Sequence, residues 1–232
     1  MLISAPALAA DIGSATEEVI AIAPISPTYN WTGGYIGGHI GWGWDRADFT
    51  LDNTGWWGPA GASTDIDSSS FLGGAQIGYL HQGQNNIVFG VDLSASIADL
   101  NDSVASPAFP GIDTWSAGID WFLLAQARLG YTGGRWLGFL QGGYAGAEGN
   151  ASATPPFVSD SNWHNGWTLG AGFSFKVNNR VSIGAEYNYI DLGSETYNVP
   201  NPPVVVAGSE TASVDHQVNV IKGTINYYFG GP

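Results

Sequence analysis

Histidine is the side chain in this 232-residue sequence best suited to metal, haem or acid–base chemistry, and four histidines are present. They are His39, His81, His164 and His216. None of them forms an HExxH motif or the short spacing of a ligand pair on one element. Cysteine is absent, which excludes a disulfide framework and thiolate-bound metals. A two-histidine site therefore requires a fold that brings distant residues together.

The serines and glycines do not form a catalytic motif either. A lipid-modifying enzyme could use a serine and a histidine, and Ser69 or Ser70 with His81 is the candidate pairing. On a strand, these residues would be separated by about 30 Å. The stretch "GGYIGGHIG" has no Lys-Ser/Thr and no following helix, so it is not a phosphate-binding loop. The sequence therefore favours a protein that is not an enzyme and holds no cofactor.

Carboxylates are the most abundant charged groups. The chain has 20 acidic and 6 basic residues and a net charge of −14, which excludes a nucleic-acid-binding protein. The pairs Asp65/Asp67 and Asp99/Asp102 offer oxygen ligands for Ca²⁺ or Mg²⁺, although neither pair has the spacing of a calcium loop. The alternative is a solvated acidic surface.

The composition indicates the environment in which these residues are held. Charged residues make up 11% of the chain, while glycine occurs 34 times and Trp, Tyr and Phe ten times each. Soluble domains carry roughly 25% charged residues. No run of about 18 apolar residues is present, so the sequence contains no transmembrane helix. Low charge with many aromatic residues favours an outer surface that meets lipid.

Side-chain character alternates with a period of two from residue 31 onward. In the first segment Ile36, Ile40 and Trp44 share one face, while His39 lies on the other. Each predicted strand is about ten residues long. The eight segments cover approximately residues 35–44, 71–80, 87–97, 118–131, 136–145, 167–177, 181–189 and 221–229. This alternation is typical of strands with one apolar and one small or polar face.

The connections between these segments alternate between long and short, which is typical of a transmembrane barrel with short periplasmic turns and long outer loops. The sequence therefore predicts an all-β, eight-stranded, antiparallel, transmembrane up-and-down β-barrel. The alternative is a soluble ligand-binding barrel, but its apolar face would point inward. Here the more apolar face carries the Trp and Tyr residues, as a face toward lipid would, and the less apolar face carries the charges. Fourteen of the twenty acids would lie in or beside the long loops.

The opposite face carries charges that would point into the barrel. These are three basic and three acidic residues, namely Arg128, Lys176, Lys222, Asp92, Asp120 and Glu186. Buried charges must be paired, so we expect a closed network that also includes His39, Gln76, Gln141 and Asn188. Inward glycines would make room for these side chains. The network could serve as a polar plug or line a narrow ion path, and the sequence leaves both open.

The N-terminal residues are predicted to lie outside the barrel. Ala7-Leu8-Ala9 fits an A-x-A cleavage site after an apolar run, so residues 1–10 are interpreted as the remnant of a signal peptide. Residues 11–30 contain proline and turn signals without a clear period, and we interpret them as a flexible periplasmic linker. The barrel would then cover residues 31–229.

Six motifs in order resemble one known family. They are "NWTGGYIGGHIGWGW", "FLGGAQIGYLHQ", "IVFGVDLSAS", "DWFLLAQARLGY", "SIGAEYNYIDLG" and "VNVIKGTINYYF". They are similar to strands of the small outer-membrane β-barrel proteins of alphaproteobacteria, known as porin-family or outer-membrane immunogenic proteins. Gln126 stands where that family has a basic residue. The resemblance extends over residues 31–229.

This resemblance implies localisation in the bacterial outer membrane and contact with its lipid and lipopolysaccharide. It also implies insertion by the outer-membrane assembly machinery, which would recognise Phe229 as the terminal aromatic residue, although three residues follow it. The family's roles are surface antigen, envelope integrity and small-solute passage. Haem binding by some relatives cannot be carried over to any residue here. The expected function is structural, with a narrow pore as the alternative, and a homo-oligomer is left open.

Overall fold

The computed structural model describes residues 29–54, 59–105, 114–154, 158–200 and 209–229. Within these residues the chain forms eight β-strands. They are β1 (Gly33–Leu51), β2 (Ser63–Gln82), β3 (Ile87–Ala105), β4 (Thr114–Gly133), β5 (Trp136–Thr154), β6 (Val158–Lys176), β7 (Val181–Pro200) and β8 (Ser209–Phe229). No helix in these ranges is long and apolar enough to cross a membrane.

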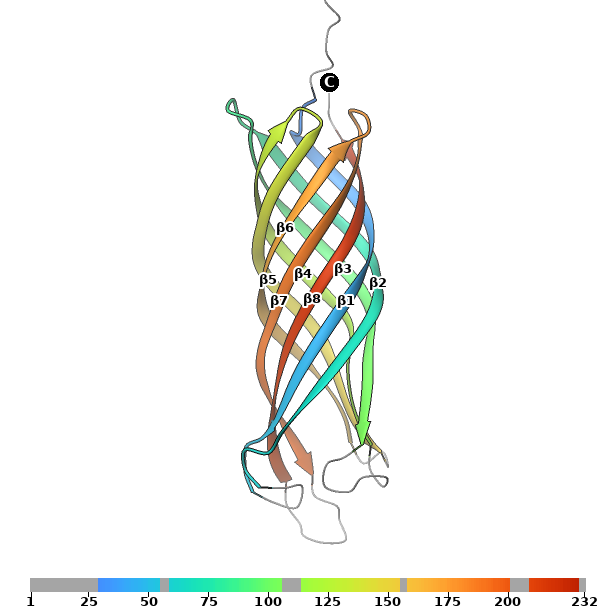
Figure 1. The fold of residues 1–232 in the computed structure, drawn as a ribbon, viewed down its shortest axis with the longest axis vertical. Helices are drawn as coiled ribbons and strands as arrows, with labels where there is room; N and C mark the ends of the chain where they lie inside the picture. The colour runs from blue at the N-terminus through green and yellow to red at the C-terminus, as the bar shows by residue number, and fades with distance from the viewer. Residues whose placement is uncertain (1–28, 55–58, 106–113, 155–157, 201–208, 230–232) are drawn as a thin grey trace, which may run out of the picture.

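Each strand pairs antiparallel with the next, and β8 pairs back onto β1 to close a barrel (Figure 1). The predicted all-β, antiparallel, up-and-down arrangement is confirmed. Closure leaves the backbone groups of every strand with a neighbour on both sides, which a bilayer requires because it offers no water to an open edge.

Three short connections lie at the same end of the barrel as the last strand residues, and we call this the turn end (Figure 1). The β4–β5 connection is a two-residue hairpin in which Gly134 has φ +75°, a conformation that disfavours other residues. In the β6–β7 turn the Asn178 side chain accepts hydrogen bonds from the backbone N–H groups of Arg180 and Val181, both at 2.8 Å. The opposite end is called the loop end.

The strands are longer than the sequence predicts. They contain 19 to 21 residues instead of about ten, so residues assigned to long loops belong to strand walls. Twenty residues at ~3.3 Å each, tilted by about 40°, span about 50 Å of barrel height. An outer-membrane apolar band is only about 25 Å tall. The sequence pattern misses the loop-end half because its polar residues do not alternate with apolar ones.

The exposed apolar side chains form a belt around the turn-end half of the barrel. Ile40 is 76% exposed, whereas its neighbour His39 is 4% exposed, as the period-two pattern predicts. Aromatic residues border the belt on both sides. On the loop side they include Trp44, Phe71, Trp121, Tyr144, Trp163 and Trp167, and on the turn side Tyr131, Trp136, Tyr227 and Phe229. Two aromatic girdles around an apolar band are typical of barrels that span the outer membrane.

Candidate functional site

The barrel interior holds an ion-pair network centred on Glu186 of β7. Its Oε1 lies 2.8 Å from Nη2 of Arg128, and its Oε2 lies 3.2 Å from Nζ of Lys222. Arg128 also lies 3.5 Å from the carboxylate of Asp92. These four side chains are at most 4% exposed. Two cations therefore face two carboxylates, as burial in a low-dielectric interior requires.

Neutral side chains extend this network across the barrel. Gln141 donates to Glu186 Oε2 at 3.2 Å and to Asn188 Oδ1 at 2.8 Å. The hydroxyl of Tyr35 donates to Asp92 at 2.6 Å. Glu186 Oε2 thus has a second partner besides Lys222, and Asp92 Oδ2 has a hydrogen bond of its own, as buried carboxylates need in addition to their counter-ions.

A second branch of the network contains His39. Its Nδ1 lies 3.2 Å from Oε1 of Gln76, and its Nε2 lies 2.8 Å from the Ser96 hydroxyl. Gln76 in turn donates to Asn226 at 2.7 Å. A Cβ on Gly74 would lie 2.7 Å from His39 Nε2, so this inward glycine leaves room for the imidazole. Nine of the ten predicted interior residues are therefore buried, and Asp120 is the exception.

The prediction that Asp120 points inward is wrong. The pairing of β4 with β5 shifts register between Ile119 and Trp121, which marks a β-bulge. Ile119 is 1% exposed and Phe122 is 4% exposed, so both face inward, while Asp120 and Trp121 between them face outward. The bulge inserts one residue into the alternation and moves Asp120 to the outer face. A period-two pattern cannot detect such a slip.

Lys176 is buried but stands apart from the ion-pair network. Its Nζ donates to the backbone carbonyl of Asn30 at 2.6 Å and of Asn179 at 3.3 Å. It also lies 4.3 Å from the ring centroid of Tyr228 and 5.1 Å from that of Trp31. Carbonyl oxygens and aromatic faces thus take the place of a carboxylate here. The lysine ties the residues before β1 to the turn end.

Trp31 closes the interior at the turn end. It is fully buried, its backbone N–H donates to Gln82 Oε1 at 2.9 Å, and its indole N–H donates to the Gly134 carbonyl at 3.0 Å. It belongs to an apolar group, the turn-side cluster, with Tyr35, Leu80, Val88, Leu137, Phe139 and Tyr228. Asn30 and Tyr29 also contact the barrel, although the sequence places them in a flexible linker.

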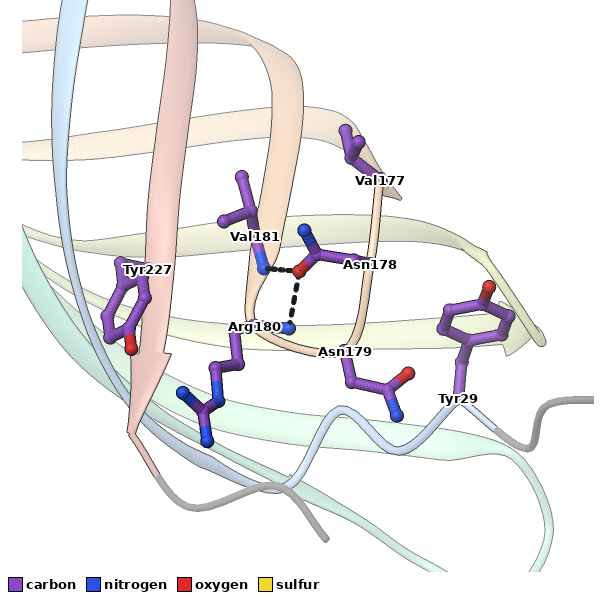
Figure 2. A pocket seen from close by; sticks show the side chains of 7 residues that line it. All are labelled: Tyr29, Val177, Asn178, Asn179, Arg180, Val181 and Tyr227. Atoms are coloured by element: carbon purple, nitrogen blue, oxygen red, sulfur yellow. Dashed lines mark hydrogen bonds between the residues drawn. The ribbon is translucent and has the colours of Figure 1, made fainter.

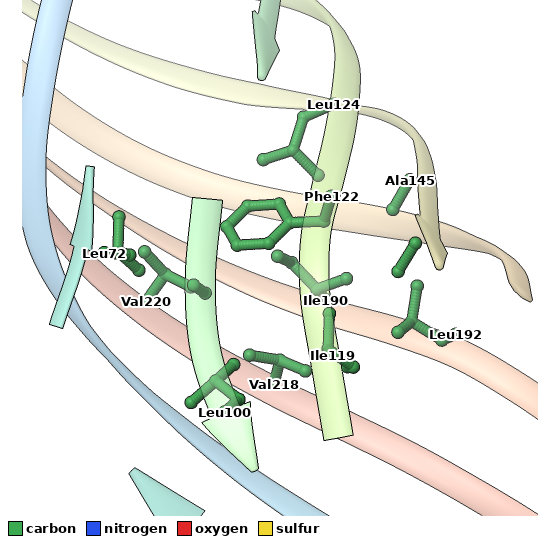
Figure 3. Packing of buried hydrophobic residues seen from close by; sticks show 12 residues of the cluster. Leu72, Leu100, Ile119, Phe122, Leu124, Ala145, Ile190, Leu192, Val218 and Val220 are labelled. Atoms are coloured by element: carbon green, nitrogen blue, oxygen red, sulfur yellow. The ribbon is translucent and has the colours of Figure 1, made fainter. Parts of the chain in front are cut away.

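A second apolar group, the loop-side cluster, lies beyond the ion-pair network. Figure 3 shows its side chains converging from several strands onto the same interior space. Its members are Leu72, Ala98, Leu100, Ile119, Phe122, Leu124, Ala145, Ala147, Ile190, Leu192, Val218 and Val220. Along each strand they follow the network residues in the direction of the loop end. The polar network is therefore enclosed between two apolar layers.

Two histidines meet beyond the loop-side cluster, and sequence reasoning missed this. The rings of His164 and His216 lie 5.3 Å apart at their centroids, and His216 Nδ1 lies 3.0 Å from Oδ2 of Asp45. Asp45 is 6% exposed, although the sequence places it at the edge of a loop. Asp45 is an odd-numbered residue of β1, like the inward-facing Tyr35 and His39. The period-two pattern could therefore have predicted that Asp45 points inward. His81 lies exposed beside Phe89 at the turn end.

The proposed cation ligands lie on strand walls, not in loops. Asp65 and Asp67 are exposed on β2, and Asp67 pairs with Arg46 at 3.2 Å. The side chains of Asp99 and Asp102, on β3, lie outside the described part of the structure. Among the residues described, no group of three or more His, Asp or Glu side chains is arranged to hold a metal ion. Divalent cation binding stays a prediction, which calorimetry with Ca²⁺ checks against a buffer blank.

The comparison with protein families matches this architecture. Residues 1–229 match the family model described as "Outer membrane protein beta-barrel domain". The 31 kDa outer-membrane immunogenic protein of Brucella melitensis is 30% identical over 201 residues, which cover 81% of each chain. The 25 kDa outer-membrane immunogenic protein of Brucella abortus is 28% identical over 201 residues, covering 87% of this chain and 84% of that protein.

A solved structure supports the fold. The outer membrane protein OprG of Pseudomonas aeruginosa superposes with a TM-score of 0.58 at 16% identity, covering 88% of this chain and 99% of OprG. At that identity the likeness concerns the fold alone. The likeness to OprG, the closed barrel, the apolar belt and the curated relatives all lead to the same conclusion. The chain belongs to the outer-membrane protein β-barrel domain family and is a protein of the bacterial outer membrane.

Proposed function

We propose that this protein is a non-conducting structural barrel that supports the outer membrane and presents an acidic surface outside the cell. The observation that carries the proposal is the filled interior. A buried ion-pair network occupies its middle, and an apolar cluster lies on each side of the network. The barrel wall itself, with its apolar belt and aromatic girdles, supplies the anchoring in lipid.

The two apolar clusters argue against the narrow pore as the main function. An ion that crosses an apolar constriction must lose its water, and such constrictions block conduction by dewetting. Leu100 and Phe122 are at most 4% exposed, as are Leu137 and Tyr228 at the other end. An eight-stranded barrel is just wide enough for side chains to fill it. The network between the clusters serves as a plug in this proposal.

Planar-bilayer recordings of the purified, refolded protein test this proposal. We expect a flat current trace from wild-type protein whose β-structure has been verified by circular dichroism. A steady conductance that changes in Arg128→Ala or Glu186→Ala, but not in Arg46→Ala at the loop end, would support the pore instead. Arg46 is the matched control because it is exposed and pairs only at the outer wall.

The loop-end half of the barrel is the surface that we propose is presented outside the cell. It extends beyond the apolar belt and carries exposed carboxylates such as Asp65, Asp67 and Asp215. The curated relatives are outer-membrane immunogenic proteins, which is consistent with a surface role. None of this requires catalysis, and we infer that the protein is not an enzyme.

Assembly is proposed to depend on Phe229. This residue is the last of β8, pairs with Gly34 across the barrel seam, and is 56% exposed. We expect Phe229→Ala to slow insertion by the assembly machinery while spontaneous refolding in detergent is little changed, because the side chain makes few interior contacts. Tyr227→Ala, in the same belt, is the control. Equal insertion rates for Phe229→Ala and wild-type protein would contradict this assignment.

A further inference from the structure

The turn end has a charge opposite to that of the chain as a whole. Arg135 lies in the β4–β5 turn and Arg180 in the β6–β7 turn. Within the turns and strand ends at residues 29–36, 78–90, 130–140, 174–184 and 223–229, all of them described, no carboxylate occurs. A protein with a net charge of −14 therefore presents an exposed cationic rim at this end.

This rim contains an open pocket of about 530 Å³ beside the β6–β7 turn (Figure 2). Tyr29, Val177, Arg180 and Tyr227 contribute to its lining. Asn178 holds the turn by accepting two backbone hydrogen bonds through its Oδ1, which leaves its amide NH₂ as a donor. The pocket thus combines a guanidinium and an amide donor with tyrosine and valine side chains.

The pocket lies where the apolar belt meets water. Val177 is 46% exposed and Tyr227 is 42% exposed, and both face outward with the other belt residues. Next to the pocket, the Arg135 guanidinium lies 4.8 Å from the ring of Tyr29 and 5.1 Å from that of Phe175. Arginines stacked on aromatic rings at a belt edge meet the lipid headgroups, because the aromatic girdle sits at headgroup level.

We propose that this pocket binds the phosphate of an anionic phospholipid in the leaflet that contacts the turn end. Arg180 forms no salt bridge with any described residue, so its guanidinium is available for a phosphate. The Asn178 amide can donate to the same headgroup, while Val177 and Tyr227 contact its apolar portion. Basic pockets at the rim of membrane proteins recognise anionic headgroups in this way. A soluble anion would make no use of the apolar edge.

The test uses the full chain, refolded in detergent, with phosphatidylglycerol or phosphatidylcholine of identical acyl chains. Native mass spectrometry counts the lipid molecules retained by each protein. We expect preferential retention of phosphatidylglycerol and a weakening of about fivefold in Arg180→Gln. Arg46→Gln, at the loop end, should bind like wild-type protein. Circular dichroism confirms that both variants are folded.

Addition of inorganic phosphate separates a lipid site from a simple anion site. We expect it not to displace phosphatidylglycerol, because the apolar edge adds to the binding of the lipid. Displacement by phosphate, equal retention of the two lipids, or an Arg180→Gln variant that binds like wild-type protein would each overturn the proposal. The outcome is independent of whether the barrel conducts, since the pocket lies on the outer rim.

Discussion

The charges at the centre of the barrel and those on the loop-end wall follow opposite rules. In the centre, Arg128 and Lys222 face Asp92 and Glu186, and neutral amides complete the hydrogen bonding. On the wall, Asp48 lies opposite Asp65 on one side and Asp215 on the other, so that three carboxylates form a row across β2, β1 and β8. Burial forces charges to balance, whereas water and salt screen the wall enough for like charges to remain side by side.

The largest expected effect tests the balance in the centre. Glu186→Gln removes the carboxylate shared by Arg128 and Lys222 and leaves two buried cations with one counter-ion between them. Breaking a buried pair in this way costs about 3–5 kcal/mol. Urea unfolding of protein in lipid vesicles measures the loss.

Glu195→Gln is the matched control, because Glu195 lies on the same strand in the loop-end half. Glu195 is only half-buried and forms no salt bridge with a described residue, so its loss should cost less than about 1 kcal/mol. If the two variants lost equal stability, the contrast between centre and wall would be wrong.

A smaller effect tests how tightly the centre is packed. A methyl group on Gly74 would meet His39 Nε2 at 2.7 Å and would also contact the Ala95 carbonyl. We expect Gly74→Ala to destabilise the barrel by about 1–3 kcal/mol, because the interior is already full.

The control for packing is Gly138→Ala, since nothing lies within 4 Å of a Cβ added at Gly138. This outward-facing variant should be nearly neutral in the same unfolding assay. A Gly74→Ala variant as stable as Gly138→Ala would show that the network leaves free space, which would favour a water-filled path.

The smallest effect concerns the carboxylate row, which lies beyond the apolar belt. The hydrogen-bonded carboxyl of Asp65 raises the pKa of Asp48 above its usual value. Like charges directly opposite each other cost about 0.2–1 kcal/mol, so Asp48→Asn should stabilise the protein by that amount at neutral pH. Because its pKa is raised, Asp48 of the wild-type protein gains its proton at a higher pH than an ordinary aspartate does. That protonation relieves the repulsion as the pH falls. The advantage of the variant should therefore shrink at acidic pH.

Asp67→Asn provides the opposite control for the wall. Asp67 pairs with Arg46, so this variant removes an attraction and should not stabilise the barrel. Unfolding measured at neutral and acidic pH compares the two variants. If Asp67→Asn stabilised the protein as much as Asp48→Asn, net charge alone, and not the row, would explain the effect.

Much of this architecture could be predicted from the sequence. The period-two alternation identified the outward face of the belt and most of the interior polar residues, including Arg128, Glu186 and Lys222. It failed at Asp120, where a bulge shifts the alternation, and it underestimated the strands, since their loop-end halves lack an apolar face. The role of Trp31 was hidden because an aromatic residue before a strand carries no periodic signal.

Away from the bulges, the sequence by itself determined which side of each strand a residue occupies, because successive side chains of a regular strand point to opposite faces whatever the strand's neighbours are. Only the tertiary structure decided which interior residues meet. Arg128 and Glu186 are 58 residues apart, and His216 and Asp45 are 171 residues apart, yet each pair is in contact. Barrel closure, strand register and local bulges create these contacts, and each depends on pairing between distant segments that no local pattern records.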